Sequence, residues 1–186
     1  MRPILLSCLA AMLLLGCASL APSTVGRLAS LDPLTTDPSG IELLVILPKG
    51  LAATPGSAKL EFGAQRASEV RKGTFQLEDR PVGRDILVPS GATARRYGVS
   101  AADAARLRAL QAEIAIWKQE GKAEGMLGLG IGGCAVDGGP AKDATGSVLI
   151  RFAADEPFLP LVDDAMLVDL LGRETLAAIQ PCNGAE

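Results

Sequence analysis

The sequence predicts an α+β domain: a mainly antiparallel sheet, one long helix packed on a face of it, and a C-terminus tied by a disulfide. Three observations lead to this fold class. Several short segments alternate apolar with polar residues, as half-buried strands do. A single long helical pattern follows them. An even pair of cysteines, Cys134 and Cys182, lies in the C-terminal part of the chain.

Four segments in the first half of the domain have strand patterns. Residues 41–47 are almost all apolar, which predicts a central strand covered on both faces. Residues 58–64 and 70–78 alternate cleanly between apolar and polar side chains. Residues 86–88 predict a short edge strand. The connections are short, which favours antiparallel pairing.

The long helix is predicted over residues 100–120. Ser100 is placed to cap its N-terminus, and Gly121 to end it. One apolar stripe runs along it, made of Leu107, Leu110, Ile114 and Trp117. The stripe predicts packing on the sheet, and the alternative is that it fills a groove on a partner.

The C-terminal part combines a glycine-rich strand with short helical turns. Residues 126–135 predict that strand, and residues 144–152 its hairpin mate after a turn at 137–140. The glycines project to one face, where we expect the C-terminal segment to lie, held by the disulfide. Residues 164–179 predict two helical turns broken at Gly172.

Gly128, Gly130 and Gly133 fit the pattern G-x-G-x-x-G of dinucleotide-binding proteins. That chemistry needs the motif between a strand and a helix, so that phosphate meets helix N–H groups. Here the glycines fall inside a predicted strand and no helical pattern follows. We therefore expect no nucleotide site.

Composition excludes several functions. The 186 residues include no histidine, which excludes Ser-His-Asp and Cys-His catalysis and any zinc site with a histidine ligand. The net charge of −3 makes the chain a poor nucleic-acid binder. Aromatic residues are only 3% of the chain, which disfavours stacking platforms for sugars or single-stranded nucleic acid. We expect no cofactor and no metal.

The N-terminus has the pattern of an export signal. Arg2 precedes an apolar run over residues 4–15, interrupted only by Ser7. As a helix this run would be about 18 Å long, which is too short for the hydrocarbon core of a bilayer. Its length is typical of a signal peptide.

The run ends in Leu14-Leu15-Gly16-Cys17, which resembles the lipobox of bacterial lipoproteins. The resemblance implies cleavage after Gly16 and acylation of Cys17, which becomes the membrane anchor. Ala18 follows the cysteine, and in Gram-negative sorting a residue other than Asp there implies the outer membrane, facing the periplasm. One acyl chain binds a membrane only marginally, and proteins of this family carry three.

The resemblance and the composition divide the chain into three parts. Residues 1–16 are the predicted signal peptide. Residues 17–40, rich in Ser, Thr, Pro, Gly and Ala, follow as a lipidated cysteine and flexible tether. Residues 41–186 are then a single periplasmic domain, and beyond the lipobox this domain resembles no characterised family.

The cysteine count favours the same compartment. Of four cysteines, Cys8 leaves with the signal and Cys17 takes the lipid. Cys134 and Cys182 remain, and in an oxidising compartment a disulfide between them is expected. It would close a loop of about 49 residues and contribute roughly 4 kcal/mol. The alternative is a redox or nucleophilic thiol, but neither cysteine sits in a C-x-x-C motif.

Other candidate sites are weaker. Adjacent carboxylates, such as Asp163-Asp164, point to opposite faces of a strand and do not form a catalytic pair. No S-x-x-K motif is present for Ser-Lys catalysis. Arg95, Arg96 and Tyr97 are a candidate surface contact for lipid phosphate or an acidic glycan, and a solvated approach to the helix is the alternative.

Three functions follow from these patterns. The first is a non-enzymatic envelope lipoprotein that serves as a binding or assembly accessory for another envelope protein. The second is a carrier or sensor of an apolar ligand, suggested by the aliphatic-rich domain. The third is a hydrolase without histidine, which would need carboxylates or a Ser-Lys pair gathered in a pocket.

Overall fold

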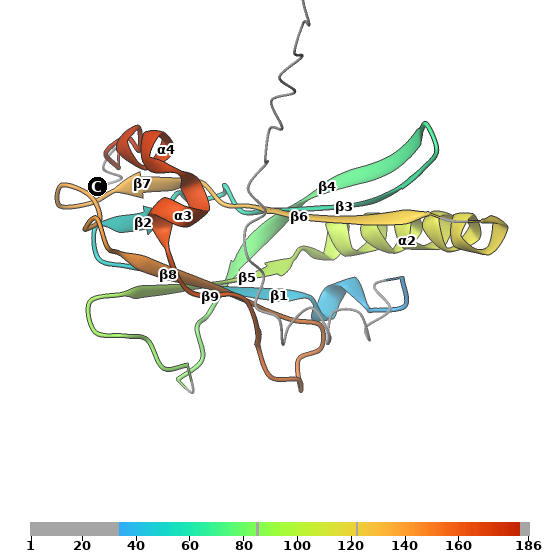
Figure 1. Cartoon of the computed structure of the whole chain (residues 1–186). Helices are drawn as coiled ribbons and strands as arrows, with labels where there is room; N and C mark the ends of the chain where they lie inside the picture. Colours follow the sequence, from blue (N-terminus) through green and yellow to red (C-terminus); the bar gives the residue numbers. More distant parts are fainter. Residues whose placement is uncertain (1–33, 85, 122, 183–186) are drawn as a thin grey trace, which may run out of the picture.

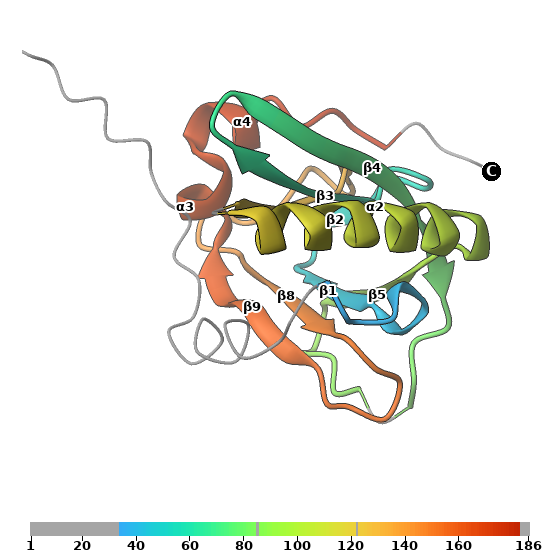
Figure 2. The ribbon, with the colours of Figure 1, turned by 90° about the vertical axis from the view of Figure 1, so that its right-hand side faces the viewer.

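The computed structural model describes residues 34–182 except residues 85 and 122 (Figure 1). Seven antiparallel strands form one sheet in the order β6-β3-β4-β5-β1-β8-β9. The sheet curls as a half-barrel around α2 (Ala101–Glu120), which lies along its concave side (Figure 2). The strands of this sheet are β1 (Glu42–Leu47), β3 (Lys59–Arg66), β4 (Glu69–Arg80), β5 (Thr93–Val99), β6 (Glu124–Gly130), β8 (Thr145–Arg151) and β9 (Leu159–Met166). The α+β class and the mostly antiparallel pairing are as predicted.

The central position of β1 is confirmed. It pairs with β5 on one side and with β8 on the other. Leu43 and Val45 point to the concave side and join the main core, whereas Leu44, on the opposite face, is also buried. A strand buried on both faces needs apolar side chains at consecutive positions, which explains its unbroken apolar run.

Helix α2 packs on the concave face through the predicted stripe. Leu107, Ile114 and Trp117 are almost fully buried, and Leu110 is partly buried against the same core. They meet apolar side chains of β3 and β4, among them Leu60 and Phe75. This burial, rather than helix propensity, holds a helix in place on a sheet.

Two polar residues define how α2 begins. The Ser100 hydroxyl accepts a hydrogen bond from the Asp103 N–H at 3.1 Å, which is the predicted cap. Asp103 is itself buried, and its Oδ2 accepts from the backbone N–H of Gln76 on β4 at 2.7 Å. The first turn of the helix is thereby joined to the sheet.

Three strands of the structure were not predicted from the sequence, and one predicted strand does not form. Residues 86–88 form no strand, and β5 follows instead at Thr93–Val99, between β4 and β1. A short strand, β2 (Leu51–Ala53), and the long edge strand β9 were also missed. Alternation in β5 is hidden because charged side chains occupy both faces near its start, and Pro160 masks the beginning of β9.

The glycine-rich segment does not pair as predicted. It splits into β6, which pairs with β3, and β7 (Gly133–Ala135), which pairs with β2. The expected hairpin mate, β8, pairs instead with β1 and β9. The split comes at Gly132, whose N–H donates to the Ser57 hydroxyl at 2.9 Å. A Cβ at Gly132 would lie 2.9 Å from the Ser57 Cβ, so only glycine permits this approach.

The disulfide between Cys134 and Cys182 is confirmed. It ties the C-terminal segment to β7, and Ala135 exchanges backbone hydrogen bonds with Gln180 and Cys182. The segment therefore extends the edge of the small sheet. The prediction that it covers the glycine face is wrong. Before it come α3 (Leu167–Leu171) and α4 (Arg173–Ala177), separated at Gly172 as predicted.

Part of the predicted tether is folded against the domain. Residues 34–37 lead into a short 3-10 helix, η1 (Pro38–Gly40), in which Pro38 is buried. Asp37 pairs with Arg108 of α2 at 2.5 Å. The predicted signal peptide, Gly16 and Cys17 lie outside the described residues. In the portion that the structure describes, no helix has the length and apolarity needed to span a membrane.

A candidate apolar cavity

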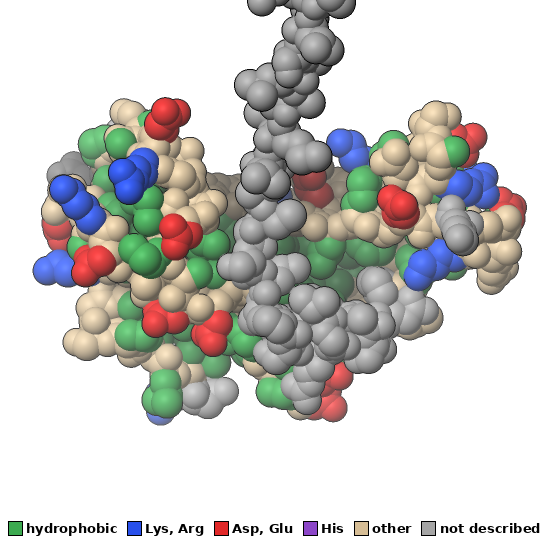
Figure 3. Space-filling model, viewed as in Figure 1, with side chains coloured by type: hydrophobic (Ala, Val, Ile, Leu, Met, Phe, Trp, Pro, Cys, Tyr) green, Lys and Arg blue, Asp and Glu red, His purple; other side chains and the backbone are tan. Residues whose placement is uncertain are grey.

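The half-barrel is open between its two edge strands, β6 and β9, and a cavity of about 630 Å³ lies there. Its floor is formed by α2, through Leu107 and Ile114. A volume of this size is typical of pockets that hold small molecules. Hydrophobic side chains are visible in the hollow next to β6 in Figure 3.

Both walls of the cavity are apolar. On one side Leu60 and Phe62 of β3 stand beside Leu129 of β6, and on the other Val148 of β8 stands beside Leu161 of β9. Because strand residues two apart share a face, each strand presents a row of aliphatic side chains to the cavity. The walls offer dispersion contacts and few hydrogen bonds, which suits a hydrocarbon ligand.

Small residues keep the space open. Gly63 and Ala64 of β3 and Gly125 of β6 line the cavity together with Ala123. A Cβ placed on Gly125 would meet no atom within 4 Å, so its missing side chain leaves room instead of permitting a close contact. At Gly63 a Cβ would lie 2.5 Å from the Arg71 carbonyl oxygen, so glycine is required there for packing.

The mouth of the cavity combines an exposed leucine with a few polar groups. Leu127 on the edge strand is 49% exposed and also lines the cavity, which is unfavourable for a large aliphatic side chain in water. Gln111 is 3% exposed, and its amide donates to the Thr36 carbonyl oxygen at 2.9 Å. Lys118 is the charged residue among the described residues that line the cavity.

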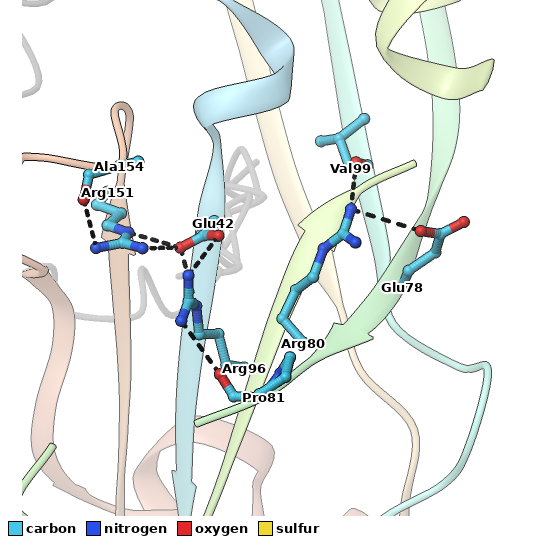
Figure 4. Close-up of polar contacts among 8 residues, drawn as sticks. All are labelled: Glu42, Glu78, Arg80, Pro81, Arg96, Val99, Arg151 and Ala154. Carbon is cyan, nitrogen blue, oxygen red and sulfur yellow. Dashed lines mark hydrogen bonds and ion pairs between the residues drawn. The ribbon is translucent and has the colours of Figure 1, made fainter. Parts of the chain in front are cut away.

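A separate ionic cluster lies on the opposite, convex face of the sheet (Figure 4). Glu42 of β1 bridges Arg96 of β5 at 2.7 Å and Arg151 of β8 at 2.5 Å. Arg80 lies alongside over Gly98, and it reaches the Val99 carbonyl oxygen at 3.3 Å. These contacts connect neighbouring strands, so the cluster has a structural role.

Burial of Glu42 tends to raise the pKa of its carboxyl, but the hydrogen bonds from Arg96 and Arg151 outweigh burial and hold that pKa below its usual range. The guanidinium of Arg151 also lies 4.8 Å above the ring of Phe158. The two arginines thus share one carboxylate, and both are partly buried.

The structure places Arg96 on the face of β5 opposite to Arg95 and Tyr97. Arg96 is engaged with Glu42, and Tyr97, on the other face of β5, is only 3% exposed. Arg95 stays exposed and lies 3.8 Å from Asp79. Burial, together with the Asp79 carboxylate, raises the pKa of Tyr97. Consecutive residues of a strand alternate faces, so adjacency in the sequence does not bring these groups together.

Neither thiol chemistry nor metal binding has a site in the described region. Cys134 and Cys182 are joined to each other. In residues 34–182, leaving out 85 and 122, no three His, Cys, Asp or Glu side chains are grouped to hold a metal ion. Gly128, Gly130 and Gly133 lie on β6 and β7, with no helix after them to receive a phosphate.

Sequence reasoning identified none of the cavity as a site. The aliphatic composition suggested an apolar ligand, but it did not say that the sheet stays open or which residues face the gap. The available signal was the glycine-rich edge segment, which was interpreted as a surface for packing.

Comparison with protein-family models, with curated proteins and with solved structures finds no match for this chain.

Proposed function

We propose that this protein is a lipid-anchored envelope lipoprotein, without enzymatic activity, whose half-barrel binds an apolar ligand such as a hydrocarbon chain. The single observation that supports the binding of an apolar ligand is the apolar cavity of about 630 Å³ between β6 and β9. The anchor is proposed from the lipobox-like Leu14-Leu15-Gly16-Cys17.

The chemistry of the cavity favours binding over catalysis. Its lining contains no Asp, Glu, Ser or Cys among the described residues, so no carboxylate base and no serine or cysteine nucleophile faces the space. Apolar walls contribute about 25 cal/mol for each Å² of ligand surface that they remove from water. Leu127, exposed at the mouth, would gain such burial when a ligand enters.

The proposed position of the protein matches the proposed ligand. A domain tethered to a bilayer meets membrane lipids at high local concentration. A bound chain could then be passed to, or sensed with, another envelope protein, which retains the accessory role that the sequence suggested. That partner remains a prediction.

A photoactivatable fatty acid tests the cavity in the native setting. Membranes carrying the full-length protein are isolated first, so that the probe cannot be incorporated into the anchor by metabolism. The probe is added, activated with light, and the labelled peptides are mapped by mass spectrometry. We expect labels on peptides from β6, β8 and α2.

Two matched pairs of variants make the test specific. Val148→Trp fills the cavity and should abolish labelling, whereas Val70→Trp, on an exposed side chain of β4, should not. Leu127→Asp places a charge at the mouth and should reduce labelling, with Leu87→Asp as its exposed control. Labelling that is spread over the surface, and equal in all four variants, would refute the ligand site.

A further inference from the structure

We propose that the ligand is an anionic amphiphile with one hydrocarbon chain, and that Lys118 at the end of the cavity pairs with its acidic headgroup. This inference rests on the proposed function and specifies its ligand. It is supported by the position of Lys118 among the cavity residues, and by the finding that its ammonium group has no partner among the described residues.

The cavity follows one stripe of α2. Leu107, Gln111, Ile114 and Lys118 all line it, at spacings of four, three and four residues. Such spacings place side chains on one face of a helix. At a rise of 1.5 Å per residue, the stripe is about 16 Å long. An extended chain can lie along it, from the buried Leu107 to the exposed Lys118.

Lys118 differs from the other cations of α2. Arg106 pairs with Asp103, and Arg108 pairs with Asp37. For Lys118, by contrast, neither an ion pair nor a hydrogen bond of its ammonium group is found within the described part of the chain. Nearby arginines of the sheet are also matched, since Arg66 pairs with Glu120 and Arg71 with Glu113.

Among the described residues, the lining of the cavity therefore presents one positive charge and no negative one. Because Asp and Glu are missing from its described lining, a carboxylate or phosphate held there touches no like charge of the lining. The guanidinium groups nearby are already paired, so among the described residues of this region Lys118 is the cation that remains to pair with a headgroup. An ammonium group on a flexible stem suits a point charge of this kind.

A lysine in the last turn of a helix also interacts favourably with the helix dipole. This structural role makes a different prediction. If it were the whole role, replacing Lys118 would lower the stability of the helix and leave ligand preference unchanged. The test therefore measures the preference for an acidic headgroup over a neutral one, in addition to binding itself.

Two photoactivatable probes with the same chain, one a fatty acid and one a fatty alcohol, are compared on the full-length protein in isolated membranes. We expect the wild type to label with the acid about fivefold better, as an exposed ion pair of up to about 1 kcal/mol allows. Lys118→Gln should remove the preference, and Lys118→Glu should reverse it. Lys72→Gln, on β4 and outside the cavity, should retain it.

The outcomes separate this inference from the proposed function. If acid and alcohol label the cavity equally, and Lys118→Gln changes nothing, the headgroup assignment is wrong and the apolar site stands. If neither probe labels the cavity, both are wrong. A preference for the acid that weakens with added salt, and that disappears in Lys118→Gln, supports the ion pair.

Discussion

Oε2 of Glu42 lies 2.5 Å from Nη2 of Arg151, and the two residues face each other across β1 and β8. The same carboxylate reaches Arg96 of β5, so one acidic side chain connects three adjacent strands. The three side chains are between 13% and 22% exposed. The cluster holds together the strands from which the half-barrel curls.

Glu42→Gln should destabilise the protein by about 2–3 kcal/mol, because it leaves two partly buried guanidinium groups without their counter-charge. Equilibrium denaturation by urea measures the change. Glu78→Gln is the matched control, since the pair of Glu78 with Arg80 is long, at 3.5 Å, and exposed. That variant should cost less than about 1 kcal/mol. Equal losses of unfolding free energy in the two variants would show that the Glu42 cluster stabilises the protein no more than an exposed ion pair does.

The Glu42 cluster should also make stability depend on acid pH. The pKa of Glu42 is lower in the folded protein than in the unfolded chain. Its contribution is therefore complete above the unfolded value, about 4.3, and is lost as the pH falls through the folded pKa. The difference in stability between wild type and Glu42→Gln, measured from pH 7 down to pH 3, should shrink below about pH 4. A constant difference would contradict this.

Removing the disulfide should cost about 4 kcal/mol in the chain-entropy model. The double variant Cys134→Ser/Cys182→Ser, compared with wild type by denaturation without reductant, measures the loss. Alkylation without reduction should modify neither cysteine in the wild type. Modification of both thiols in unfolded, unreduced protein would rule out the bridge.

Asp103→Ala should destabilise the protein by about 2 kcal/mol, because the backbone N–H of Gln76 loses the buried carboxylate that accepts its hydrogen bond. The change should appear in thermal or urea unfolding. Glu113→Ala, on the same helix, is the control, because Glu113 forms only an exposed pair with Arg71. Its effect should stay below about 1 kcal/mol, and a result in which Glu113 matters more would reverse this ranking.

Cys17→Ala should leave the protein unprocessed or released from the membrane, because the thioether requires the thiol. Fractionation of cells and the intact mass of the protein report the outcome. Cys8→Ala, inside the predicted signal, should leave both the membrane location and the mature mass unchanged. A wild-type mass without acyl chains would contradict the anchor.

Local patterns predicted the elements that depend on neighbours in the chain. The stripe on α2 from Leu107 to Trp117, its cap at Ser100 and the break at Gly172 follow from spacing and backbone preference alone. The apolar run of β1 identified an inner strand. The disulfide followed from the number of cysteines left in an oxidising compartment, without any knowledge of distance.

Those local patterns do not predict which strands pair when they are distant in the sequence. Residues 144–152 read as a strand in either pairing, and only the folded sheet decides that β8 lies against β1 and β9. Arg95, Arg96 and Tyr97 were grouped because they are adjacent in the sequence, whereas a strand turns consecutive side chains to opposite faces. Contacts between remote segments determine such choices.

The sequence by itself determined the long helix, several of the strands, the position of the inner strand and the pair of cysteines, because each depends on periodicity or on counting. Tertiary structure alone decided the order of the strands and the gap between β6 and β9. The cavity exists because the curvature of the sheet, the length of α2 and the missing side chain at Gly125 leave a gap that no other described residue fills. Unfilled space is a property of many segments packed together, so no single stretch of sequence records it.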